Sequence, residues 1–400
     1  RYNGSVINFP KLFEKIDPPN VVPQLKRIKE DLKEYNLFGT FGHVTTAIPG
    51  DRLSASIIGN RGCRAACTFC SVAKFMGPKV RSTNEDITID TIKYLYEECG
   101  VRHIDWLDDD LVAYPESATK LFNRIADLNY DLVFTIQNAI LARNINKDLI
   151  DAIGRAGFVH VGFGVESGNE TVRKKIKRIT LIDNLEKTID YFREKFPHVF
   201  IHCNFMLGFP GETAGEIIQT FNLAMQLKVD WCQFALVQAL PNTRMWDQFV
   251  ELNDPRVHKP NKYSPASAAK LEGISIDEIG LNVGDIFSFP EDKVLDLNEL
   301  NDIWYPINTA VNFLNNYNLV SNADYIWKLK NFLNALHDAY PLDPTMLLTL
   351  SKCYDIEQNS EKRDQYKVLA KEIIKKHKFW KELLTYLKKF DNSNIIANAA

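Results

Sequence analysis

Short apolar runs alternate with helical patterns between residues 53 and 237. Six runs have the length and composition of β-strands, and helical stretches separate them. These runs are residues 54–58, 103–107, 132–137, 160–164, 199–206 and 231–237. Strands separated by helices indicate parallel βαβ units, so the pattern predicts an α/β fold with a six-stranded parallel sheet. Periodicity alone does not decide whether this sheet is open or curls into a partial barrel.

Glycine and proline residues between these strands indicate where the predicted helices end. Gly100 and Gly157 each follow a helical pattern, as glycine at a helix C-terminus often does, and Pro197 ends another. The predicted helices cover about 89–98, a stretch from about Ser117, 147–156, 181–196 and a stretch after Thr213. Residues 1–51 form a proline-containing lead-in segment, and residues 52–250 form the strand–helix core. Residues 251–299 are loop-rich, and residues 300–400 are predicted to be wholly helical.

Composition adds mainly exclusions. The chain has 400 residues, 45% of them apolar and 25% charged, which is the balance of an ordinary globular protein. A net charge of -3 argues against disorder and gives no whole-chain indication of nucleic-acid binding. No apolar stretch approaches the ~20 residues of a membrane helix, and the first residues do not resemble a signal peptide. We therefore expect a cytoplasmic protein without a membrane partner.

Three of the seven cysteines lie close together, directly after the first strand. Cys63, Cys67 and Cys70 have the spacing C-x3-C-x2-C, on a loop at the strand end where parallel α/β proteins place their chemistry. Three thiolates suit a [4Fe-4S] cluster in which the protein holds three irons and the fourth is open to another ligand. The other four cysteines, Cys99, Cys203, Cys232 and Cys353, are expected to be buried small apolar groups.

Other uses of the three thiols remain open. A structural zinc site closes with four ligands, and His43 could supply the fourth, but the chain has no second C-x2-C pair. A redox dithiol would need only two cysteines. The contrasting class of protein is therefore a non-enzymatic zinc or iron–sulfur binding module.

The cysteine loop after the first strand of a six-fold βα chain resembles the radical S-adenosylmethionine (radical SAM) superfamily. The resemblance covers about residues 52–250 and implies a partial (β/α)6 TIM-type barrel, followed here by an all-helical C-terminal region. It also implies that Cys63, Cys67 and Cys70 hold the cluster and that the open iron binds S-adenosylmethionine. An electron from an external flavodoxin- or ferredoxin-type donor then cleaves the cofactor, and the resulting 5'-deoxyadenosyl radical abstracts hydrogen from a substrate.

The resemblance assigns further residues to the bound S-adenosylmethionine. Phe69, between the second and third cysteines, would lie beside adenine, or it packs the loop. Asp108 and Asp109, which end the second strand, resemble a pair that accepts hydrogen bonds from the cofactor ammonium; a solvated, helix-capping loop is the alternative. Glu166, in a Gly-Val-Glu-Ser-Gly stretch, would bind the ribose diol.

Two assignments at the cofactor pocket are weaker. Arg178, or Lys177, could pair with the cofactor carboxylate, although the basic run 173–178 reads more simply as a solvated face that leads a helix. Gln137 ends the third strand among polar neighbours and is a candidate pocket residue.

The run Leu-Gly-Phe-Pro-Gly-Glu-Thr at 207–213 is similar to one in cobalamin-dependent methylases and methylthiotransferases. This similarity favours a radical reaction of that branch, such as C-methylation. The cobalamin-binding signature Asp-x-His-x-x-Gly is absent from this chain, so a cobalamin domain lies upstream of Arg1 or the chemistry is different. Methylthiotransferases carry three further N-terminal cysteines and residues 1–62 have none, which ranks that reaction second. The sequence indicates no substrate.

Overall fold

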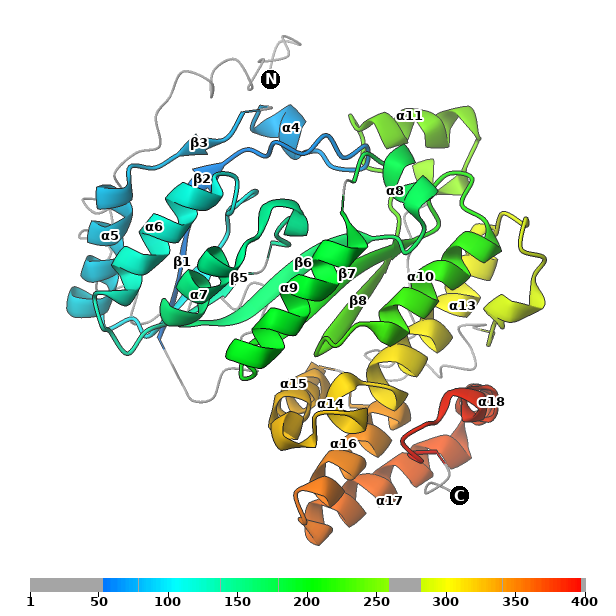
Figure 1. The fold of residues 1–400 in the computed structure, drawn as a ribbon. Coiled ribbons are helices and arrows are strands. Elements are labelled where there is room, and N and C mark those ends of the chain that lie inside the picture. Colours follow the sequence, from blue (N-terminus) through cyan, green and yellow to red (C-terminus); the bar gives the residue numbers. More distant parts are fainter. Residues whose placement is uncertain are drawn as a thin grey trace, which may run out of the picture.

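The structure is a computed structural model that describes residues 53–77, 79–136, 138–178, 180–258, 282–339 and 341–396. Six parallel strands form one sheet in which each strand pairs with the next along the chain (Figure 1). They are β1 (Ser54–Ile57), β4 (His103–Trp106), β5 (Val133–Ile136), β6 (Phe158–Glu166), β7 (Phe200–Leu207) and β8 (Trp231–Leu236). The predicted α/β fold is confirmed, and each strand lies within two residues of its predicted bounds.

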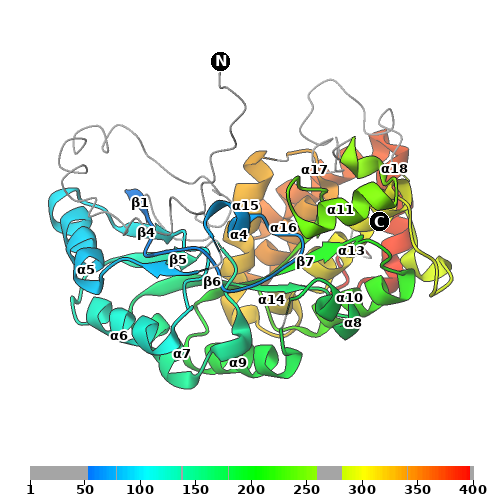
Figure 2. The same cartoon turned by 90° about the horizontal axis from the view of Figure 1, so that it is seen from above.

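The sheet curves, and β1 and β8 remain its two edges, so the barrel is partial. Figure 2 shows helices lining the outer, convex side of this curved sheet. They are α5 (Glu85–Lys93), α6 (Pro115–Ala126), α7 (Lys147–Arg155), α9 (Ile182–Lys195) and α10 (Ala214–Gln226). The first helix begins four residues before the predicted start, because the Asn84 side chain caps it by accepting a hydrogen bond from the Asp86 amide at 2.8 Å.

The two faces of the sheet differ in chemistry. The outer face carries packed aromatic rings, and the ring centroids of Trp106 and Phe134 are 6.0 Å apart. The inner face carries buried histidines that are hydrogen-bonded. His103 contacts Thr135 through Nε2 at 2.9 Å, and His160 Nε2 lies 2.7 Å from His202 Nδ1. A polar inner face is consistent with a barrel whose interior admits a polar ligand.

The C-terminal region is helical, as predicted, and most of it lies at the end of the sheet where the strands begin. Figure 1 shows this part on the opposite side from α4 (Val72–Phe75), α8 (Glu170–Lys175) and α11 (Arg244–Glu251), whereas the first helix of the region, α13 (Leu297–Thr309), lies beside β8. The region consists of α13, α14 (Tyr317–Val320), α15 (Ile326–Ala339), α16 (Pro344–Ile356), α17 (Ser360–Lys376) and α18 (Lys378–Leu387). Its apolar residues belong to two hydrophobic clusters, and each cluster also contains residues of the barrel.

The lead-in segment, including His43, and residues 259–281 of the loop-rich segment lie outside the described residues. Among the residues that are described, none of the helices is both long and apolar enough to cross a bilayer.

Candidate functional site

The three clustered cysteines lie in the loop after β1, at the carboxyl edge of the sheet. Cys63, Cys67 and Cys70 line one cavity of about 440 Å³. Backbone amides approach two of the sulfurs: Ala65 N is 3.4 Å from Cys63 Sγ, and Val72 N is 3.5 Å from Cys70 Sγ. Amide donors to cysteine sulfur are one means by which proteins adjust the potential of an iron–sulfur centre.

Backbone hydrogen bonds connect this cysteine loop to the segments that follow β6 and β8. Thr68 N donates to the carbonyl of Ile176, just after α8, and the Thr68 carbonyl accepts from Met245 N in α11, both at 3.0 Å. Gly62 has φ +90°, and a Cβ there would meet the Lys79 carbonyl oxygen at 2.3 Å. The loop therefore needs glycine at this position to take its path.

The aspartates after β4 accept hydrogen bonds from the backbone of the cysteine loop. Asp108 accepts a hydrogen bond from Gly59 N at 2.6 Å, and Asp109 accepts one from Gly62 N at 2.9 Å. Asp109 also lines the cysteine cavity. Asp108 instead borders a different cavity, and burial is the main reason that its pKa rises to about 7. The alternative of a solvated loop is wrong for Asp108, because that side chain is buried.

Asp110 completes this set. Its carboxylate pairs with the Arg64 guanidinium, with Nε and Oδ2 3.0 Å apart. No sequence pattern connects Arg64 with Asp110, because the contact forms only when the fold brings the ends of β1 and β4 together.

Glu166 and Arg178 form a buried pair beside the cysteines. Glu166 Oε1 lies 3.5 Å from Arg178 Nη2, and Arg178 Nη1 lies 3.8 Å from Cys67 Sγ. Arg178 also donates to the Gly164 carbonyl from Nε at 3.1 Å and from Nη2 at 3.0 Å. Burial raises the pKa of Glu166, and the neighbouring guanidinium opposes that rise. The charged pair therefore borders the cavity in which the thiols lie.

Two features of this pair correct the sequence interpretation. The basic run 173–178 does not lead a helix: it begins in the last turn of α8 and continues beyond the helix end. Arg178 is not part of a solvated face either, because its exposed fraction is 8%. Glu166 has φ +70°, a strained conformation for a residue with a side chain and one that is enriched at functional sites.

Phe69 lines the cysteine cavity and also packs against an apolar cluster next to it. Its ring centroid is 6.1 Å from that of Phe209, in the turn that follows β7. Phe69 therefore both packs the loop and forms part of the cavity wall.

The turn after β7 is held by one buried carboxylate. Glu212 accepts hydrogen bonds from Gly208 N at 2.7 Å and Phe209 N at 3.1 Å, while Thr213 caps α10 in a capping box. Burial raises the pKa of Glu212 from 4.5 to about 8.

This raised pKa gives a testable pH dependence. Since the folded protein favours protonated Glu212, its contribution to stability is complete below about pH 4.5 and is lost as the pH rises through about 8. Between about pH 5 and 8, wild type should lose stability relative to Glu212→Gln, whose amide oxygen can accept the same two bonds. Urea unfolding of both proteins across this range measures the difference. A difference that is constant with pH would contradict the shifted pKa.

Some functional candidates lie elsewhere or were missed. Gln137 lies outside the described residues. The next residue, Asn138, was not predicted, although it lines the cysteine cavity and its amide donates to the carbonyls of Leu107 at 3.0 Å and Asp108 at 3.1 Å. Its position directly after the third strand was the available signal.

The chemistry of the three thiols is compatible with binding a cationic metal centre. Burial raises the pKa of Cys63 to about 11 and also raises that of Cys67, so both favour the protonated form without a metal. Bound iron reverses this preference, because a coordinating thiol loses its proton. The described parts of the chain contain no three His, Cys, Asp or Glu side chains grouped closely enough to bind a single ion. Cys99, Cys203, Cys232 and Cys353 are buried apart from this cavity, as expected.

Comparisons with known proteins find several similar proteins. An uncharacterized methyltransferase of Pyrococcus horikoshii is 28% identical over 63% of this chain and 51% of its own length. Cytidylyl-2-hydroxyethylphosphonate methyltransferase of Streptomyces wedmorensis is 32% identical over 44% of this chain and 32% of its own length. A putative methylthiotransferase of Methanocaldococcus jannaschii is 23% identical over 62% of this chain. The chain thus spans about half, or less, of the length of these relatives.

Among solved structures, the radical S-adenosylmethionine methyltransferase TsrM from Kitasatospora setae is similar over 50% of this chain and 39% of its own, with 17% identity and a TM-score of 0.46. That likeness is too low to carry an argument about function. The family model described as the Radical SAM superfamily matches residues 57–224, which include the cysteine loop, Glu166 and the turn after β7. Residues 57–224 of this chain therefore belong to the radical SAM superfamily.

Proposed function

We propose that this chain reductively cleaves S-adenosylmethionine at a [4Fe-4S] cluster held by Cys63, Cys67 and Cys70. The observation that carries the proposal is the shared cavity: three thiols and the Glu166–Arg178 pair meet at the carboxyl edge of the sheet. When bound, the cluster and S-adenosylmethionine supply a one-electron cleavage that gives methionine and a 5'-deoxyadenosyl radical for hydrogen abstraction from a substrate.

The protein's own part is to seat the cofactor and exclude water. Four residues line the cysteine cavity and, in this proposal, contact S-adenosylmethionine: Phe69, Asp109, Glu166 and Arg178. Asp108 supports them by holding Gly59, and a direct cofactor contact from Asp108 or from Gln137 remains a prediction. An external reductant of the flavodoxin or ferredoxin class supplies the electron.

We favour radical methylation over other reactions of the superfamily. Two of the three relatives above are named methyltransferases, and the Gly-Phe-Pro-Gly-Glu-Thr turn occurs here with its buried Glu212 in place. Methylthiotransfer is the second candidate, supported by the relative from Methanocaldococcus jannaschii. Cobalamin would be the methyl carrier in the first case. This chain lacks the Asp-x-His-x-x-Gly signature, so absorbance spectra of the purified chain with added cobalamin test whether it binds the carrier without that motif.

Anaerobic reconstitution with iron and sulfide tests the cluster directly. We expect about four irons and four sulfides per chain, with a brown absorbance that dithionite bleaches. The triple variant Cys63→Ala, Cys67→Ala, Cys70→Ala should bind none, whereas Cys353→Ala, which removes a buried thiol of α16, should match wild type. Purification with one zinc and no iron would instead support the non-enzymatic binding module.

A further inference from the structure

A second cavity, of about 580 Å³, adjoins the cysteine loop. It shares part of its wall with the cysteine cavity, through Arg64, Ala65, Ala66 and Arg178. Its eight lining residues include five basic ones and none that is acidic, although the whole chain has a net charge of -3. The basic members are Arg64, Arg143, Lys174, Lys177 and Arg178.

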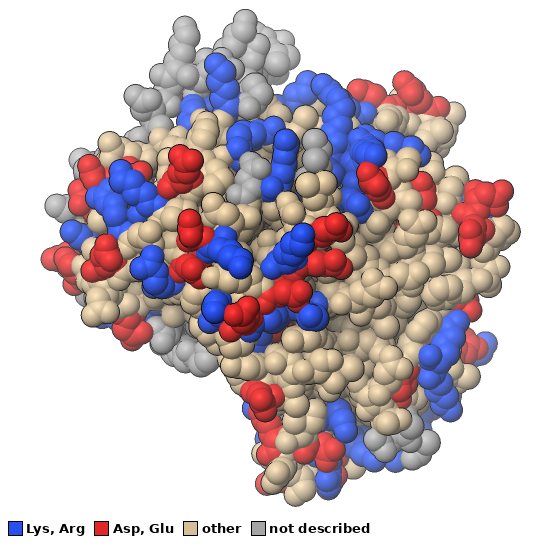
Figure 3. All heavy atoms as spheres, viewed as in Figure 1, with Lys and Arg blue, Asp and Glu red and all other residues tan. Residues whose placement is uncertain are grey.

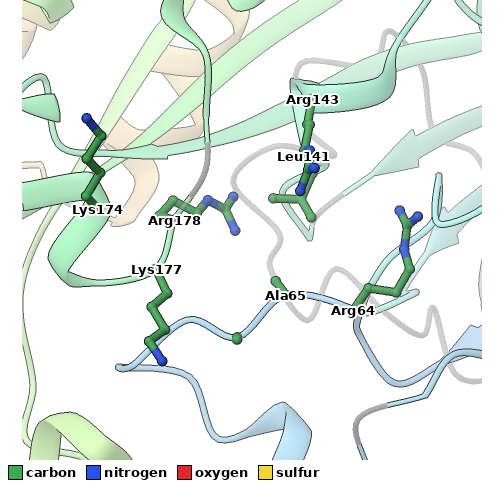
Figure 4. A pocket seen from close by; sticks show the side chains of 8 residues that line it. Arg64, Ala65, Leu141, Arg143, Lys174, Lys177 and Arg178 are labelled. Atoms are coloured by element: carbon green, nitrogen blue, oxygen red, sulfur yellow. The ribbon is translucent and has the colours of Figure 1, made fainter.

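The basic side chains come from three separate strand ends. Arg64 lies in the cysteine loop after β1, and Arg143 lies in the short 3-10 turn Ala142–Asn144 after β5. The other three follow β6: Lys174 is in the last turn of α8, and Lys177 and Arg178 lie just beyond the end of that helix. Figure 4 shows the guanidinium groups of Arg143 and Arg178 pointing toward one another across the cavity, while the Lys174 amine points away. Lys and Arg also gather over α8 on the face seen in Figure 3.

Three of the five charges already have acidic partners. Arg64 pairs with Asp110, Lys174 pairs with Glu170 at 2.6 Å, and Arg178 pairs with Glu166. Within the described ranges, Arg143 and Lys177 have no ion pair. These two charges are therefore the ones available to an added anion.

We propose that this cavity binds the phosphate-bearing part of a small-molecule substrate. Arginine and lysine are the side chains that hold phosphate oxygens, and arginine can do so through two parallel hydrogen bonds. A concave site of 580 Å³ has the size of a small-molecule pocket rather than that of a flat docking surface for a macromolecule. The role as a substrate site rests on the proposed function, since the shared wall places the anion next to the loop that carries the thiols.

Anion binding can be measured without any radical chemistry. The experiment is calorimetric titration of the reconstituted protein with inorganic pyrophosphate, in the absence of S-adenosylmethionine and reductant. We expect saturable binding to wild type that weakens about tenfold or more in Arg143→Gln and in Lys177→Gln, because each loses a charge-assisted contact. Lys175→Gln is the matched control: the lysine lies in the same basic run and is exposed, yet it does not line the cavity, so binding should stay within about twofold of wild type.

Charge-conserving replacement separates a binding role from a structural one. Arg143→Lys should recover much of the affinity lost in Arg143→Gln, which a folding defect would not allow. The proposal is overturned if wild type does not bind pyrophosphate, or if the control weakens binding as much as the cavity variants do. Binding of a short RNA without binding of pyrophosphate would also overturn it, in favour of a nucleic-acid surface. Release of 5'-deoxyadenosine by wild type is scored separately, so failure of the anion site and failure of the proposed function are distinguishable.

Discussion

Replacing Gly164 with alanine should displace Arg178 and abolish cleavage of S-adenosylmethionine. A Cβ at this position would lie 1.6 Å from Arg178 Nη2 and 2.8 Å from Glu166 Oε1. Gly164 does not have the left-handed φ that only glycine adopts easily, so the side-chain clash alone decides the outcome. Overpacking of this kind costs about 1–3 kcal/mol of folding free energy. Anaerobic assay of 5'-deoxyadenosine release and urea unfolding measure the two effects.

A double-mutant cycle with Arg178→Ala tests whether the clash is the cause. If it is, Gly164→Ala should cost less stability when Arg178 is already absent, with a coupling of about 1 kcal/mol or more. Activity should remain low in the double variant, because Arg178 itself borders the thiols. Additive losses of stability, or full activity in Gly164→Ala, would contradict the role given to this glycine.

Replacing Asp230 with asparagine should destabilise the junction between the barrel and the C-terminal helices. Asp230, just before β8, is fully buried and pairs with Arg193 at 2.8 Å and with Lys328 of α15 at 2.7 Å. Burial favours its neutral form, but Arg193 and Lys328 outweigh that effect and lower the pKa of Asp230. Removing the carboxylate charge leaves two cations without compensation, which costs about 3–5 kcal/mol. Urea unfolding followed by circular dichroism measures the loss.

The chain offers a matched control for this change. Glu357 accepts from Lys330 of the same helix α15 at 2.6 Å, but that pair is partly exposed. Glu357→Gln should therefore cost less than about 1 kcal/mol. Adding Lys328→Met to Asp230→Asn should restore part of the stability, since it removes one of the unpaired cations. If Asp230→Asn and Glu357→Gln lowered the free energy of unfolding equally, the stabilising role given to the buried Asp230 pairs would be wrong.

The strands and outer helices could be predicted from local pattern because one face of each is uniformly apolar. Helix starts were harder, since the cap at Asn84 depends on one side chain that precedes the periodic residues. The predicted strand ends before Glu166, because a carboxylate does not continue an apolar strand pattern. In the structure β6 extends to Glu166, whose side chain lines the cysteine cavity. The burial of Arg178 also could not be predicted from the local sequence. A basic segment has the same composition whether its side chains face solvent or pack against the end of a strand.

At the site, spacing identified the three thiols, since sequence neighbours on one loop stay neighbours in space. The contacts that hold this loop could not be predicted, because they join positions far apart in the sequence, such as Gly59 with Asp108 and Thr68 with Met245. The sequence predicts a cofactor contact for Asp108 and Asp109; the fold adds that Asp108, Asp109 and Asp110 each contact a different point of the cysteine loop. The pairing of Arg64 with Asp110 and the anion cavity follow only from the fold.

Single-turnover release of 5'-deoxyadenosine tests the central claim most directly. The reconstituted protein is incubated anaerobically with dithionite and S-adenosylmethionine, and the product is quantified by chromatography. We predict release by wild type and by Cys353→Ala, and none above background by Cys63→Ala, Cys67→Ala or Cys70→Ala. Release that persists in any of the three loop variants would contradict a cluster held by these thiols.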